Sequence, residues 1–217
     1  REFWVNFFKQ MQGIIALDPL SLYFLVIHCV SMLVGVAIDS RAYPVMLTAG
    51  TTGKSTSSRI LYLLFNGGKF IVTSLKRAIQ VEELCLNNQL LTVFDNLDHL
   101  TKSTKDALFS LLERNTILGA DENDVDNRNI IILNAKEIES IPSSMEDRTI
   151  HYRPNDKFMN KDYNSHSLEV FVMALRNDFW YNVVELLNSV LSDPEFLEKK
   201  KVASREIRET NSSLIKI

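Results

Sequence analysis

The chain has 217 residues, of which 24 are basic and 27 are acidic, and 46% of its residues are hydrophobic. A chain of this length can bury a core of its own, so no disulfide framework is needed, and the near balance of charge excludes a uniformly basic nucleic-acid-binding surface but not a local basic stripe. The two cysteines, Cys29 and Cys85, lie in apolar stretches and match no metal-binding or redox spacing, which favours a reducing, cytoplasmic location. Because the first residue is Arg1, we expect the chain to be a piece of a longer protein.

The first 40 residues are expected to form an N-terminal helical segment that packs on the rest of the chain. Residues 2–15 are amphipathic at helical spacing, and Leu20 to Ile38 are almost uniformly apolar. The second stretch is nearly long enough to cross a membrane, but it has no basic flank and contains Ser21, His28 and Ser31. We therefore expect a buried helix and no membrane contact, with a membrane span as the alternative.

Strand-like and helix-like patterns then alternate along the chain. Alternation of this kind predicts an α/β fold with a mostly parallel sheet covered on both faces. The pattern predicts a three-layer core over residues 41–156 and a C-terminal helical lid with a basic helix over residues 157–217. The expected strands are 43–49, 69–74, 89–95, 128–135 and 149–154, and the expected core helices are 55–65, 78–88 and 101–115.

The stretch TAGTTGKST lies between the first expected strand and the helix that follows it. Small residues allow backbone N–H groups to converge on phosphates, and the helix N-terminus adds positive potential. In such a loop Lys54 would reach the outer phosphates of a nucleotide and the Ser55 hydroxyl would bind Mg²⁺. Thr48 occupies the first position of the loop motif, where phosphate-binding loops usually have glycine. The alternative interpretation is that GKST occurs by chance at the start of a helix. The predicted nucleotide-binding residues are Gly50, Thr51, Thr52, Gly53, Lys54, Ser55 and Thr56.

An acidic residue at the end of another buried strand supports this interpretation. Asp95 follows the strand-forming residues LTVF and is predicted to bind the same magnesium ion as Ser55. Asn96 follows Asp95 at a position where most nucleotide-hydrolysing sites of this kind have a glutamate that polarises water. The next acidic residue along the chain is Asp98. Either Asp98 acts as the base, or Asp95 acts alone, or hydrolysis is slow. An ordinary turn after the strand is the alternative for Asp95 and Asn96.

Two further polar residues have positions that suit a nucleotide site. Asn134 ends the strand IIIL, where a carboxamide could hold the attacking water or contact the outer phosphate. Arg148 comes just before the last strand, a position suited to an arginine that acts on the nucleotide of a neighbouring subunit. A surface pair with Glu146 or Asp147 is the alternative for Arg148.

With these motifs in this order, the chain resembles AAA+ ATPases. More narrowly, it resembles the helicase-type ATPases of phages and mobile elements, relatives of primase-helicases and of superfamily-three helicases. The sequences that carry the resemblance are PVMLTAGTTGKST, LLTVFDNLDHL, RNIIILNA and SMEDRTIHY. The resemblance implies a five-stranded P-loop core with the loop strand central, a helical lid, and ATP with Mg²⁺ bound between the subunits of a ring. By this resemblance Lys54 and Ser55 belong to the nucleotide loop, Asp95 binds magnesium, Asn134 is the first sensor and Arg148 is the arginine finger. A second sensor has no clear match; Arg176 is a candidate, and a solvated helix residue is the alternative.

The function expected from this resemblance is an ATP-dependent motor acting on single-stranded or forked DNA during replication of a phage, virus or mobile element, with a hexameric ring as the expected assembly. Residues 116–129 have a plausible position for a pore segment, but they are acidic and would repel the DNA phosphates. Better candidates for DNA contacts are the basic residues Lys76, Arg77, Lys102 and Lys105. The alternative is a nucleotide-switched assembly or loader ATPase with slow turnover. A small-molecule kinase is a third, less favoured class, because the sequence offers no obvious acceptor site.

Overall fold

The computed structural model describes residues 2–33, 42–50, 52–68, 90–114, 116–118, 124–126, 129–159, 164–193 and 195. Several predictions fall elsewhere in the chain and lie outside the described residues. They are the strand 69–74, the helix 78–88, the basic C-terminal stretch 199–209, and the single residues Thr51, Lys76, Arg77 and Cys85.

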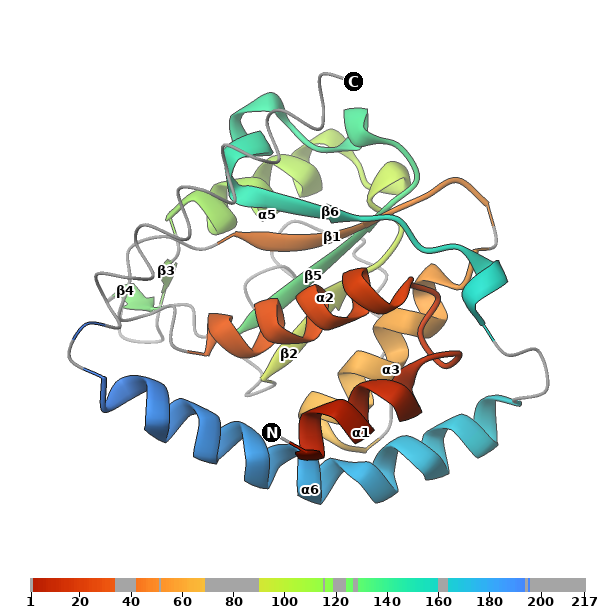
Figure 1. Ribbon diagram of the computed structural model, residues 1–217. Coiled ribbons are helices and arrows are strands. Elements are labelled where there is room, and N and C mark those ends of the chain that lie inside the picture. Colours follow the sequence, from red (N-terminus) through yellow and green to blue (C-terminus); the bar gives the residue numbers. More distant parts are fainter. Residues whose placement is uncertain are drawn as a thin grey trace.

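A parallel sheet of four strands forms the centre of the described structure, in the order β2-β5-β1-β6 (Figure 1). The strands are β1 (Tyr43–Leu47), β2 (Leu91–Phe94), β5 (Ile130–Ala135) and β6 (Thr149–Tyr152). They confirm four of the five expected strands and the α/β class, while the fifth predicted strand lies outside the described residues. The loop strand β1 lies between β5 and β6.

Both faces of this sheet are covered. Every residue of β1, β2 and β5 is buried, including Pro44, which occupies the second position of β1. Near-continuous apolar runs of this kind are typical of parallel strands that have helices on both sides. The same runs were the basis of the strand predictions.

Two helices follow strands of the sheet directly. α3 (Lys54–Asn66) begins at the predicted loop and ends at Gly67, whose φ of 69° lies in the left-handed region. At the same end, the Asn66 side chain donates to the Leu91 carbonyl and accepts from the Leu91 amide, so α3 is tied to the start of β2. α5 (Lys102–Arg114) is capped by Thr101, whose Oγ1 accepts from the Thr104 amide at 3.3 Å.

Three further helices pack against α3 or the sheet. α1 is Glu2–Met11, α2 is Pro19–Met32 and α6 is Ser165–Leu191. Asp18 caps α2 by accepting from the amides of Leu20 and Ser21. α6 runs along α1 and α3 on the side away from the sheet (Figure 1), and Phe179 of α6 contacts the rings of Phe7 and Phe65. The C-terminal helix therefore shares one hydrophobic core with the sheet.

The apolar stretch from Leu20 is helical to Met32, and residues 34–38 of the predicted helix lie outside the described residues. None of the described helices is both long and apolar enough to cross a membrane. The predicted pore segment contains two short antiparallel strands, β3 (Thr116–Leu118) and β4 (Asp124–Asp126), which its polar and acidic composition did not predict.

Cys29 is completely buried with a free thiol, and burial raises the pKa of this thiol to about 12.

Candidate active site

The predicted loop, Asp95 and Asn134 meet at the carboxyl edge of the sheet. Strand register brings them together, because Met46 pairs with Asn134 and Phe94 pairs with Leu133. The ends of β1, β5 and β2 are therefore nearly level, and the residues that follow them face the same region. This edge is where parallel α/β sheets bind ligands.

The loop between β1 and α3 has two glycines in the left-handed region. Gly50 has a φ of 79° and Gly53 a φ of 81°, a conformation that costs other residues free energy. A β-carbon on Gly53 would also lie 2.7 Å from Cβ of Ala16, whereas one on Gly50 would meet nothing within 4 Å. Gly53 is therefore required both for the turn and for close packing against the segment before α2.

Lys54 points into the protein at the start of α3. Only 7% of the residue is exposed, and Nζ donates to the carbonyl oxygens of Thr48 at 3.2 Å and Ala135 at 2.9 Å. Burial lowers the pKa of its ammonium group, an effect that Asp98 and Asp95 oppose and Lys136 reinforces. The two carboxylates therefore offset only part of the free energy that the ammonium group loses when it is removed from water.

A chain of hydrogen bonds joins α3 to the tips of β2 and β5. Ser55 Oγ donates to Asp95 Oδ2 at 3.1 Å, and Asn134 Nδ2 donates to Asp95 Oδ1 at 3.0 Å. Asn134 Oδ1 in turn accepts from Ser58 Oγ at 2.9 Å. Since Asn134 and Ser58 are completely buried, these bonds fix the position of three predicted site residues relative to one another.

Asn96 has a local structural reason for its residue type. Its φ is 58° and its ψ is 50°, so it has a left-handed backbone, and it is the only non-glycine residue with positive φ among those described. Asparagine tolerates this conformation better than glutamate does. The position next to Asp95 therefore favours asparagine on backbone grounds, whatever its effect on hydrolysis.

Asp98 is bound to the segment that follows β5. Its Oδ2 accepts from the Lys136 amide at 2.8 Å and its Oδ1 from Ser140 Oγ at 2.5 Å. Burial alone would raise the pKa of Asp98, but the hydrogen bonds from Ser140 and Lys136 hold that pKa below its usual value. The carboxylate is thus ionised and already accepts hydrogen bonds on both oxygens, and its predicted role as a base stays a prediction.

Arg148 lies at the opposite edge of the sheet from the loop of its own chain. Thr149, the next residue, pairs with Tyr43 at the amino end of β1, and β1 spans about 13 Å from there to its carboxyl end. The Arg148 guanidinium donates through Nη1 to the Glu113 carbonyl at 2.7 Å, in the last turn of α5. It is therefore too far to act on a nucleotide bound at the same chain's loop.

Arg176, the candidate second sensor, lies at the wrong end of α3. It donates to the Phe65 carbonyl at 3.2 Å, and Trp180 beside it donates to the Leu64 carbonyl at 3.1 Å. α3 has 13 residues, which places this end about 18 Å from Lys54. The sensor assignment is wrong in this structure, because Arg176 binds the Phe65 carbonyl in the last turn of α3, where a cation is favoured.

The sequence analysis missed several residues of this region. Ser58 lies one helical turn after Ser55, and that spacing could have placed both hydroxyls on one face of α3. Ser57 Oγ accepts from the Ala16 amide at 2.9 Å, and the Ala16 carbonyl accepts from the Asn155 amide at 2.7 Å. No local signal predicts these last contacts, because they join segments far apart in the chain.

The described residues suit a nucleotide with magnesium. Thr52 Oγ1 is buried in the loop and has no hydrogen-bond partner among the described residues, so it could donate to a phosphate. Ser55 and Asp95 supply oxygen ligands, which Mg²⁺ prefers. No group of three or more His, Cys, Asp or Glu side chains among the described residues could hold a metal by itself. Magnesium here would therefore need phosphate oxygens as well, as is common for this ion.

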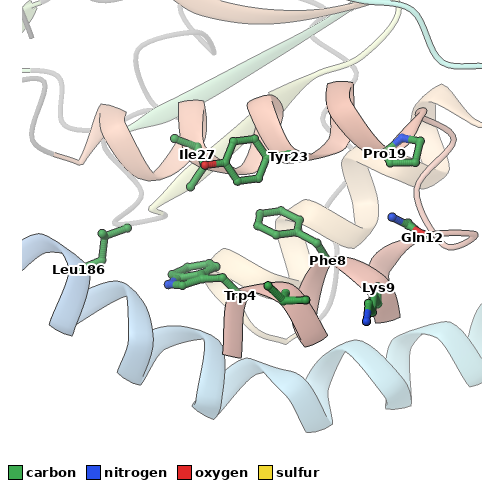
Figure 2. Close-up of a pocket in the computed structure, with 9 residues that line it drawn as sticks. Trp4, Phe8, Lys9, Gln12, Pro19, Tyr23, Ile27 and Leu186 are labelled. Carbon is green, nitrogen blue, oxygen red and sulfur yellow. The ribbon is translucent and has the colours of Figure 1, made fainter. Parts of the chain in front are cut away.

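An apolar groove elsewhere on the molecule involves none of the predicted site residues. It has a volume of about 530 Å³ and lies between α1, α2 and the later part of α6 (Figure 2). Its lining includes Trp4, Phe8, Tyr23 and Leu186. The groove is separate from the carboxyl edge of the sheet.

Comparison with known proteins adds little. No family model and no curated protein matches the chain. Among solved structures the chain is similar to one described as "a putative ATPase from Cytophaga hutchinsonii", with 12% identity and a TM-score of 0.39. The match covers 76% of this chain and 59% of that one, so the chain spans less than two thirds of that protein's length. A similarity this weak assigns no function to the chain.

Proposed function

We propose that the protein binds ATP at the loop between β1 and α3 and hydrolyses it with magnesium. The observation that carries this proposal is the hydrogen-bonded arrangement of Ser55, Asp95 and Asn134 beside the buried Lys54. A phosphate-sized anion at this place would meet a helix N-terminus, an ammonium group and the hydroxyl of Thr52, which has no hydrogen-bond partner among the described residues.

Each residue then has a chemical role. Lys54 exchanges one or both of its carbonyl partners for oxygens of the outer phosphates. These oxygens are negatively charged, so they stabilise the ammonium group better than a neutral carbonyl does. Ser55 and Asp95 hold magnesium, which would neutralise charge on the phosphates. Asn134 uses one N–H of its carboxamide on Asp95 and keeps the second for the attacking water or the outer phosphate.

The finer proposal is a ring-shaped motor that moves single-stranded or forked DNA during replication of a phage, virus or mobile element. The position of Arg148 supports shared sites, because this side chain is remote from its own loop and close to an edge that a neighbouring subunit could approach. Lys102 is exposed and Lys105 partly exposed at the start of α5, and both remain candidate contacts to the DNA backbone.

A second candidate is an ATPase that turns over slowly and switches an assembly. Asn96 in place of a glutamate favours it, as do the two hydrogen bonds that already occupy Asp98. In this function ATP binding, and not rapid hydrolysis, would hold the complex together.

Steady-state ATP turnover, measured over a range of protein concentrations with and without single-stranded DNA, tests the two candidates. Turnover per chain that rises with concentration and rises again with DNA supports the motor. Tight ATP binding with low turnover that responds to neither supports the switch. Absence of ATP binding contradicts both candidates.

A further inference from the structure

The geometry points to Ser58 as a positioning residue that holds the Asn134 carboxamide in the active site in the orientation that Asp95 selects. The inference rests on the proposed function, since it concerns how Asn134 is presented to bound ATP. Ser58 has no place in the nucleotide motif and would not contact the nucleotide itself in this role.

The contact is buried and directional. Ser58 Oγ donates to Asn134 Oδ1 at 2.9 Å, and both residues are completely inaccessible to solvent. A buried carboxamide oxygen without a donor is unfavourable, so this bond restrains the amide by satisfying its oxygen. Water cannot replace the hydroxyl without a rearrangement, because neither side chain is exposed.

The other end of the carboxamide determines its orientation. Asp95 Oδ1 is an acceptor that also receives the Asn96 amide at 3.0 Å, so the Asn134 group that faces it has to be the NH₂. If the carboxamide turned by 180°, Oδ1 would face a carboxylate oxygen and Nδ2 would face the Ser58 hydroxyl. The Ser58 hydroxyl can accept as well as donate, so Asp95 selects the orientation of the carboxamide and Ser58 holds its oxygen in place from the opposite side.

Ser58 also links this orientation to the nucleotide loop. It lies three residues after Ser55 on the same helix, and Ser55 donates to the second oxygen of Asp95. The four residues Ser55, Asp95, Asn134 and Ser58 thus form a closed circuit that starts and ends on α3. A shift of α3 when ATP binds would therefore be transmitted to the Asn134 amide through Ser58 as well as through Asp95.

The test compares Ser58→Ala with Ser57→Ala. Both serines are completely buried on the same helix, but the Ser57 hydroxyl accepts from Ala16 and is not part of the circuit. We expect Ser58→Ala to lower kcat by about tenfold, the rate effect of about one lost buried hydrogen bond, with KM changed by less than about twofold. Ser57→Ala should keep kcat near the wild-type value, and Ser58→Thr, which retains the hydroxyl, should recover most of the loss.

A second measurement does not depend on turnover. In protein labelled with ¹⁵N-asparagine, the Asn134 side-chain NH₂ signals, assigned by their loss in Asn134→Ala, should exchange slowly with water in the wild type and in Ser57→Ala. In Ser58→Ala they should shift and exchange at least about tenfold faster, because the amide is no longer held at its oxygen. Should Ser58→Ala fail to fold, Ser58→Cys, which has a weaker donor of similar shape, serves in its place.

These outcomes separate the inference from the proposed function. Equal losses of kcat in Ser58→Ala and Ser57→Ala, or unchanged Asn134 signals in Ser58→Ala, would overturn the inference while leaving ATP hydrolysis established. A wild type that does not bind ATP would overturn the proposed function, and the amide signals would still decide whether Ser58 holds the Asn134 carboxamide in place.

Discussion

Gly53 and Met159 are packed so closely that a β-carbon on Gly53 would lie 2.4 Å from Sδ of Met159. Met159 follows η5 (Asp156–Phe158), about a hundred residues along the chain, so this contact fixes the loop against a distant segment. The start of α3 is thereby enclosed by the segment before α2 and by the segment after β6. Such enclosure makes the loop sensitive to small additions of volume.

The two loop glycines should respond differently to alanine. Gly53→Ala combines left-handed backbone, which costs about 1–2 kcal/mol, with overpacking, which costs about 1–3 kcal/mol. Gly50 also has a positive φ, but a β-carbon there would meet no atom within 4 Å among the described residues. Gly50→Ala should therefore lose only the about 1–2 kcal/mol that the left-handed backbone costs. Denaturant unfolding of both variants measures the difference, and equal losses of stability would contradict the close packing.

Asp98→Asn tests whether this carboxylate is structural or catalytic. Asparagine can still form hydrogen bonds with Lys136 and Ser140 but lacks the negative charge that strengthens both of them, so we expect a loss of about 1 kcal/mol in the free energy of unfolding at pH 7. Because the folded-state pKa of Asp98 is lowered, its contribution is present above about pH 4 and is lost as the pH falls through that folded-state pKa. The difference between wild type and variant should therefore shrink below about pH 4.

The same variant separates the proposed roles of Asp98 in turnover. A structural role predicts that Asp98→Asn keeps ATP turnover within about tenfold of the wild type, a barrier change of about 1.4 kcal/mol. A loss of several powers of ten would assign Asp98 the role of the base. Steady-state turnover at saturating ATP is the measurement.

Arg148 should act on a neighbouring subunit if the sites are shared. Arg148→Ala and Lys54→Ala should each be nearly inactive alone, with losses of about 10³-fold or more for the missing arginine. In a mixture, some interfaces combine an intact Lys54 with an intact Arg148 from the neighbour, so part of the activity should return. Two variants that stay inactive when mixed, although wild-type and variant chains assemble together, would contradict sites shared in this way.

Arg176→Ala should affect stability and not nucleotide use. It removes a cation that binds the Phe65 carbonyl in the last turn of α3, at an expected cost of about 1 kcal/mol. Since the site lies about 18 Å away along α3, KM for ATP should not change. A higher KM together with unchanged thermal stability would restore Arg176 as a sensor.

The sequence predicted the elements that depend on local pattern. The apolar runs at β1, β2, β5 and β6 indicated buried strands, and their carboxyl ends placed Asp95 and Asn134 near the loop. These features depend on residues within a few positions of one another, which periodicity and turn chemistry describe well.

The sequence did not predict contacts made by tertiary packing. Arg176 was a candidate sensor because it lies on the expected lid, but the path of α6 along α3 places it at the far end of that helix. The contact of Gly53 with Met159 and the hydrogen bond between Ser57 and Ala16 also depend on how distant segments meet. No window of neighbouring residues contains that information.

The most direct test of the central claim is the binding of ATP with magnesium to the wild type and to Lys54→Met, measured by calorimetry and by thermal unfolding. Methionine fills similar space without the buried charge, so the free variant should be at least as stable as the wild type. We expect ATP to raise the melting temperature of the wild type only, and Lys54→Met to bind ATP at least about thirtyfold more weakly, a loss of about 2 kcal/mol. Equal ATP affinities for the two proteins, or no binding by the wild type, would contradict a nucleotide site at this loop.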